Sequence, residues 1–159
     1  MNKKTMAYQK LQAGKALAIH PSDTASIPNT PLVSDSGTTS ATTANKLVQT
    51  GQNFTSTVRV GDIVYNTTDT TAATVTAVDS DTTLSISEDI MAASETYTIY
   101  RGQPGACVLY IGQGGSVKVK TSGGDIVTFN GVNTGQFFPV QVSKVFATGT
   151  SATGIIGLW

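Results

Sequence analysis

Short runs of β-branched and aromatic residues, separated by glycine clusters, fill residues 107–159. Such runs with tight turns between them predict an all-β unit. The predicted strands are residues 108–111, 117–119, 126–129, 140–146 and 155–159. Because the last apolar run reaches the final residue of the sequence, we expect it to lie inside the core. The glycine cluster at 112–115 predicts a hairpin turn.

A second β pattern runs from residue 44 to residue 100. Its predicted strands are residues 47–48, 58–60, 63–65, 73–78, 84–86 and 97–100. Residues 74–78 alternate small polar and apolar side chains, as a half-buried strand does. Several short strands with Asp- and Gly-containing turns between them predict a small barrel or sandwich.

The segments before residue 44 are less regular. Residues 1–15 contain four lysines and no acid, and predict a basic arm that is either a disordered tail or docks on a neighbouring subunit. Residues 16–19 predict a short strand, which ends at the turn-favouring His20-Pro21. Residues 28–43 are rich in Ser, Thr and Pro and predict a linker.

Charge divides the chain in the same way as the strand pattern. The whole sequence carries ten acidic and ten basic residues, and only 13% of its residues are charged. Residues 28–100 hold eight of the acids and two of the bases, whereas the segments on either side are both basic. We therefore predict that the two ends form one domain and that the middle is a separate module. The low charge content is typical of extracellular or assembly-forming β proteins more than of intracellular enzymes.

Candidate catalytic and metal-binding groups are sparse. His20 is the only histidine and Cys107 the only cysteine, so neither the usual nucleophile–base pairs nor a multi-histidine metal site is indicated. Cys107 is followed by apolar residues and is predicted to be a small buried side chain. Five acids, Asp69, Asp79, Asp81, Glu88 and Asp89, lack the spacing of a calcium loop and are predicted to lie in solvated turns. The sequence therefore predicts neither an enzyme nor a cofactor.

No apolar stretch has the length of a signal-peptide core or of a membrane span, which needs about 18 residues. We therefore expect synthesis in the cytoplasm without export by the general secretory route. No nucleic-acid-binding or membrane-binding role is predicted.

Two separated stretches together resemble a known family. The first is residues 16–25, ALAIHPSDTA; the second is residues 109–115, LYIGQGG, and the run at 145–159 extends the likeness. These resemble the spike-base and head-decoration proteins of tailed bacteriophages and of gene transfer agents. Residues 28–104 interrupt this pattern, and resemble a β module found in structural proteins of marine phages.

The resemblance implies a non-enzymatic virion structural protein on the capsid surface, made in the host bacterial cytoplasm. It implies as partners the major capsid protein, further copies of the chain in a trimer or pentamer, and a spike fibre protein. The expected fold is all-β, a discontinuous β-sandwich or barrel domain with an inserted small β-barrel-like domain. Its expected parts are an arm at 1–15, the discontinuous domain at 16–27 and 101–159, a linker at 28–43 and the inserted domain at 44–100.

Two groups of residues are candidates for contacts. The basic arm supplies the expected capsid contacts, which are Lys3, Lys4, Tyr8 and Lys10. The expected residues of the core or of a subunit interface are Val140, Val142, Val145, Phe146, Ile155, Ile156 and Trp159. An alternative function is a receptor- or carbohydrate-binding module, in which aromatic residues of the insert would be exposed. The insert's aromatic residues are Phe54, Tyr65, Tyr97 and Tyr100, and most of them are expected in the core.

Overall fold

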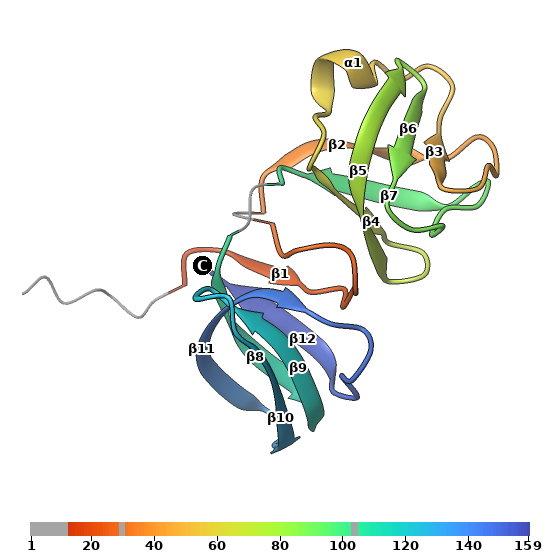
Figure 1. Cartoon of the computed structure of the whole chain (residues 1–159). Coiled ribbons are helices and arrows are strands. Elements are labelled where there is room, and N and C mark those ends of the chain that lie inside the picture. Colours follow the sequence, from red (N-terminus) through yellow and green to blue (C-terminus); the bar gives the residue numbers. More distant parts are fainter. Residues whose placement is uncertain (1–12, 29–30, 103–104) are drawn as a thin grey trace, which may run out of the picture.

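The computed structural model describes residues 13–28, 31–102 and 105–159. It is nearly all β and contains two curled antiparallel sheets, as the sequence predicts. We call residues 13–28 with 105–159 the split lobe, and residues 31–102 the continuous lobe (Figure 1). No helix in the described ranges is long and apolar enough to span a membrane.

The split lobe is built on a six-stranded sheet with the order β1-β12-β8-β11-β9-β10. Its strands are β1 (Ala16–Ala18), β8 (Cys107–Gln113), β9 (Gly115–Thr121), β10 (Ile126–Val132), β11 (Gln136–Val145) and β12 (Thr153–Leu158). The first half of β11 pairs with β8 and its second half with β9, with a register shift in both ladders. This strand therefore connects the two halves of the sheet, and the irregularity allows the sheet to curl around its own core.

The continuous lobe has a second six-stranded sheet with the order β2-β7-β4-β5-β6-β3. Its elements are β2 (Val33–Thr38), β3 (Lys46–Val48), the one-turn helix α1 (Phe54–Thr57), β4 (Ile63–Asn66), β5 (Thr71–Ser80), β6 (Thr83–Ile86) and β7 (Thr96–Tyr100). Strand β4 is buried along its whole length, because it is paired on both sides, by β5 and β7.

Each lobe has its own apolar core. The buried residues of the split lobe include Leu109, Ile111, Val117 and Val142, none of which is exposed to solvent. Those of the continuous lobe include Leu47, Phe54, Val64 and Ile99, which are also fully buried. A third, smaller cluster lies between the lobes, where Leu17 and Ala25 meet residues of β4 and β5.

Three local predictions are wrong. Residues 28–43, predicted as a linker, contain β2, which forms backbone hydrogen bonds along β7 and so needs few apolar side chains. Residues 58–60, predicted as a strand, lie between α1 and β4, with Val58 as the cap of the helix. The predicted hairpin at 112–115 does not form, because β8 and β9 are separated in the sheet by β11.

The glycines at this β8–β9 connection serve close backbone approach. A Cβ atom on Gly112 would lie 2.7 Å from the carbonyl oxygen of Gly154, and one on Gly114 would lie 2.4 Å from that of Val132. Both distances are shorter than carbon and oxygen atoms tolerate. The sequence Gly112-Gln113-Gly114-Gly115 is therefore explained by packing against neighbouring strands.

Candidate functional site

The segment from Ile19 to Ile27 crosses one end of the split lobe and joins its sheet to the continuous lobe. The amide of Ile19 donates to the carbonyl of Ile155 at 2.8 Å, and that of Ile27 donates to Ser143 at 2.8 Å. The amide of Ser22 donates to Val145 at 3.0 Å between these two points. The segment is therefore fixed by backbone hydrogen bonds to β12 and β11.

The turn within this segment is organised by short polar side chains. The Ser22 hydroxyl is buried and accepts hydrogen bonds from the amides of Thr24 and Ala25, at 3.2 and 2.9 Å. The Asp23 carboxylate accepts hydrogen bonds from the amide and hydroxyl of Thr148. These contacts lower the pKa of Asp23 below its ordinary value, the hydroxyl of Thr148 being the main cause. Residues Pro21-Ser22-Asp23-Thr24 therefore form a fixed turn against the loop after β11.

His20 lies at the junction of the lobes. Its ring stacks on that of Tyr65, with the ring centroids 4.4 Å apart, and its Nδ1 lies 3.3 Å from the carbonyl oxygen of Thr71. Tyr100 meets Tyr65 edge-on, with 5.2 Å between the centroids. Burial lowers the pKa of His20 below 6.5, and the hydrogen bond with Thr71 only partly offsets this effect. A neutral His20 therefore packs between the two lobes at neutral pH.

Polar contacts extend the junction on the other side of the turn. The hydroxyl of Thr24 lies 2.9 Å from that of Ser87 and donates to Glu88 at 3.2 Å. Thr24 belongs to the split lobe, whereas Ser87 and Glu88 follow β6 in the continuous lobe. With the aromatic stack, these contacts give the junction both an apolar and a polar part, so it orients one lobe on the other.

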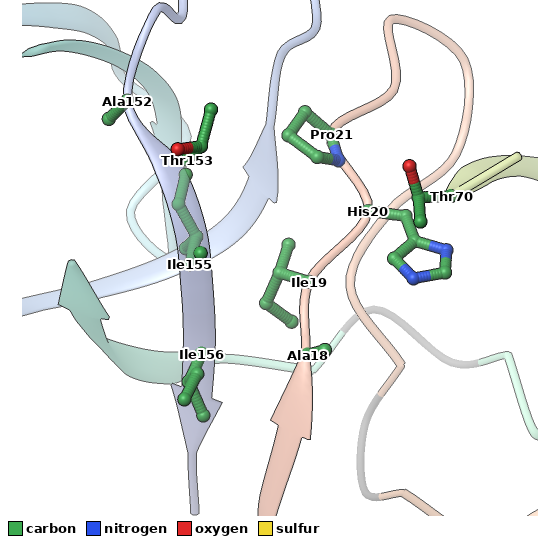
Figure 2. A pocket seen from close by; sticks show the side chains of 10 residues that line it. Ala18, Ile19, His20, Pro21, Thr70, Ala152, Thr153, Ile155 and Ile156 are labelled. Atoms are coloured by element: carbon green, nitrogen blue, oxygen red, sulfur yellow. The ribbon is translucent and has the colours of Figure 1, made fainter. Parts of the chain in front are cut away.

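A cleft of about 430 Å³ opens beside this junction. Figure 2 shows Ile19 facing Ile155 and Ile156 across it, with His20 beside Thr70. Its walls are mostly apolar side chains and backbone, and they come from β1, the residues after it, β12 and the turn before β5. Such a cleft can receive an apolar side chain, but it brings no acid–base pair together.

The predicted core or interface residues lie in several environments. Val142, Val145 and Ile155 are buried in the split-lobe core, and Val140 and Trp159 are partly buried against it. Ile156 lines the cleft, on the opposite face of β12 from Ile155. The indole Nε1 of Trp159 is buried without a hydrogen-bond partner among the described residues.

Phe146 has a distinct environment on the surface. Its ring lies beneath two ammonium groups, that of Lys118 at 5.0 Å and that of Lys144 at 5.5 Å from the ring centroid. Lys144 also donates to the carbonyl oxygens of Asp23 and Thr24, both at 3.1 Å. The predicted capsid contacts Lys3, Lys4, Tyr8 and Lys10 lie outside the described residues.

The remaining candidate groups among the described residues lie in structural contacts. Burial raises the pKa of the Cys107 thiol to about 12, so it is not a thiolate at neutral pH. Within the described ranges, no three His, Cys, Asp or Glu side chains are grouped closely enough to hold a metal ion. Asp79 is instead paired with Lys46, at 2.9 Å, and Asp89 accepts a hydrogen bond from the amide of Asn45.

The aromatic residues of the insert do not form an exposed platform. Phe54, Tyr65 and Tyr97 are at most 3% exposed, and Tyr100 is partly buried at the junction. The most exposed aromatic side chains of the described residues are instead Tyr110 and Phe137, in the split lobe. Sequence reasoning did not single them out, because both lie in runs that also supply core residues.

Comparison with family models, with curated proteins and with solved structures found no match.

Proposed function

We propose that this chain is a non-enzymatic virion structural protein that decorates or braces the capsid of a tailed phage, on which a spike or fibre can be mounted. The observation that carries the proposal is the pairing of β1 with β12. The two stretches that resemble spike-base and decoration proteins are separated by more than eighty residues of sequence, yet they meet in one sheet. The resemblance requires these two stretches to belong to one domain.

The junction of the lobes supports a mechanical role. The segment from Ile19 to Ile27 is hydrogen-bonded to β11 and β12, and it also packs against β4 and β5 of the continuous lobe. A contact made by the split lobe would therefore hold the continuous lobe in a defined direction. Attachment through many weak contacts in repeated copies would provide the strength, without any covalent chemistry.

The histidine and the cysteine of the described residues are both packed against neighbouring residues. The ring of His20 stacks on Tyr65 and its Nδ1 contacts a backbone carbonyl, while Cys107 is buried in the split-lobe core. The alternative function, sugar or receptor binding, would need exposed aromatic side chains on the insert. It is less well supported, because Phe54, Tyr65 and Tyr97 are buried. These arrangements favour the structural role.

Co-sedimentation of the purified chain with capsids that lack it tests the proposal. We expect saturable binding at a fixed number of copies per capsid, because a shell offers a repeated set of equivalent sites. The triple variant Lys3→Ala, Lys4→Ala, Lys10→Ala should bind more weakly if the arm contacts the shell. As a matched control, Lys46→Ala removes a lysine of the continuous lobe and should bind normally. The absence of binding by the unaltered chain would contradict the proposal.

A further inference from the structure

The solvent side of the split-lobe sheet can be read from its strand register. Leu109 and Ile111 are fully buried, so Val108 and Tyr110, which alternate with them along β8, point to the outside. Tyr110 lies opposite Phe137 of β11 on one side and opposite Ile156 of β12 on the other. Residues directly opposite in a ladder share a face, so these three side chains form one row across the outside of the sheet.

The row continues onto β1, and a second row runs beside it. Ala18 lies opposite Ile156, and Leu158 lies opposite Val108. We call these residues the apolar face: Ala18, Val108, Tyr110, Phe137, Ile156 and Leu158. Strands β1, β8 and β12 contain no charged residue at all, and Lys144 near the end of β11 is the only one on that strand.

An antiparallel sheet with one side in water normally places polar side chains on that side. Here Tyr110 and Phe137 are 38% and 44% exposed, on a face that offers no charge to water. The cleft beside the junction shares Ala18 and Ile156 with this face, so the apolar surface extends up to the continuous lobe. A contiguous apolar surface on both sheet and cleft is typical of a protein interface.

The other half of the same outer side is basic. Val117 and Val119 are fully buried, so Lys118 and Lys120 of β9 point outward, and Lys144 lies directly opposite Lys120. Like charges in directly opposed positions destabilise a sheet. Burial, followed by repulsion from Lys120, lowers the pKa of Lys144. Asp23 and Glu88 of the same chain lie near Lys144 and favour its charged form, but they offset only part of this effect. We call Lys118, Lys120 and Lys144 the lysine strip.

We propose that the apolar face and the lysine strip together bind the continuous lobe of a second copy of this chain, in a head-to-tail contact. The charge of the two lobes favours the continuous lobe over the split lobe as the partner. The described residues of the continuous lobe include eight acids and three bases, whereas those of the split lobe include two acids and four bases. A head-to-tail contact sets the lysine strip against an acidic lobe, while a contact between two identical faces would bring two lysine strips together.

Head-to-tail contacts form a closed ring when the rotation between successive copies closes. The inference rests on the proposed function, since a ring of copies gives a decoration protein its multivalency, and it adds the surfaces by which the copies join. In such a ring, the split lobe of each copy would cover one side of the continuous lobe of the next copy.

Analytical ultracentrifugation of the purified full-length chain tests the contact. We expect a concentration-dependent multimer, whose mass falls to that of one chain in the double variant Tyr110→Asp, Phe137→Asp. The matched double variant Tyr110→Phe, Phe137→Tyr keeps the face aromatic and should keep the multimer. Circular dichroism checks that all variants are folded. A chain that stays monomeric at every concentration overturns the proposal, whatever the variants do.

The charge component is tested separately. Lys120→Glu should weaken the multimer at low salt, Lys120→Arg should not, and added salt should weaken the unaltered multimer because it screens the attraction. A multimer that Lys120→Glu and salt leave unchanged overturns the head-to-tail arrangement. Capsid co-sedimentation distinguishes the two proposals. Multimers that do not bind capsids would contradict the proposed function alone, whereas monomers that bind capsids would contradict the ring alone.

Discussion

The two lobes are built to the same plan, a six-stranded antiparallel sheet around an apolar core, but they differ in how the chain enters them. The continuous lobe begins and ends at neighbouring strands, because Val33 of β2 lies opposite Tyr100 of β7. The split lobe is interrupted between β1 and β8, which are joined through β12. A lobe whose two ends lie close together can be inserted into another at little cost, since only the chain connection between β1 and β8 has to be opened.

The lobes also differ in what they expose. The outer side of the split lobe combines an apolar face with a lysine strip, whereas the continuous lobe is acidic and rich in Thr. This difference fits the proposed head-to-tail contact, in which the split lobe carries the binding surface and the acidic continuous lobe of a neighbouring copy binds to it. The following predictions test whether the lobes are as separate in stability as they are in surface.

The largest effects should come from the two cores. Leu109 and Ile99 are fully buried in different lobes, so truncation of either to Ala should cost about 2–5 kcal/mol through lost contacts and a cavity. We expect Leu109→Ala to destabilise the split lobe most and Ile99→Ala the continuous lobe. Amide hydrogen exchange followed residue by residue measures this. If each variant lost protection equally in both lobes, the two lobes would unfold as a single cooperative unit, and the claim that they are separate in stability would be wrong.

Asn66 gives a smaller effect, confined to the continuous lobe. Its buried amide group donates to the carbonyl of Ile90 and to Glu95, and its oxygen accepts from the amides of Thr68 and Asp69. Asn66→Ala leaves these partners unsatisfied and should cost about 2 kcal/mol.

Urea denaturation measures the loss for Asn66→Ala. The control Thr67→Ala removes an exposed hydroxyl that bonds to the Thr96 carbonyl, and should change stability by about 0.5 kcal/mol or less. An Asn66→Ala variant as stable as this control would rule out the hydrogen-bond network as a stabilising element.

Phe146 tests the lysine strip within one chain. Its ring lies beneath Lys118 and Lys144, and each exposed cation–π contact is worth about 0.5–1 kcal/mol. Phe146→Leu should therefore destabilise the split lobe by about 1 kcal/mol. Phe146→Tyr keeps the ring and should be close to neutral. If Leu and Tyr give the same thermal unfolding midpoint, the ring has no electrostatic role.

The smallest effect at neutral pH involves His20, and it grows as the pH falls. Burial lowers its pKa in the folded protein, so the unfolded chain binds a proton more readily. Stability should therefore be unaffected above the unfolded pKa of about 6.5, and should decrease as the pH falls below it. His20→Gln should remove this part of the pH dependence between pH 6.5 and the lowered pKa. A variant with the same stability–pH curve as the unaltered chain would show that His20 does not titrate on unfolding.

Period and composition predicted most strands, because residues such as Leu84 and Ile86 alternate with polar neighbours. Strand β2 was missed because it is held by backbone hydrogen bonds to β7 and buries little apolar surface. The pairing of β8 with β11 and β12 could not be predicted either, since the glycines after β8 have the composition of a hairpin turn.

The contact surfaces were harder to predict than the strands. In β8, Val108 to Ile111 are all apolar, so periodicity cannot tell which of them face the core. Only the register with β11 and β12 shows that Tyr110 joins Phe137 and Ile156 on the outside. Likewise, His20 was predicted as a turn residue, and its stack on Tyr65 depends on the docking of two lobes that sequence spacing does not encode.

Cryo-electron microscopy of virions that contain this chain tests its proposed location and copy number most directly. We predict density for both lobes on the head, repeated in a fixed number of copies at equivalent sites. The density should be lost from particles made without the chain. Density at the tail tip, or particles that contain none of the chain, would contradict a capsid decoration role.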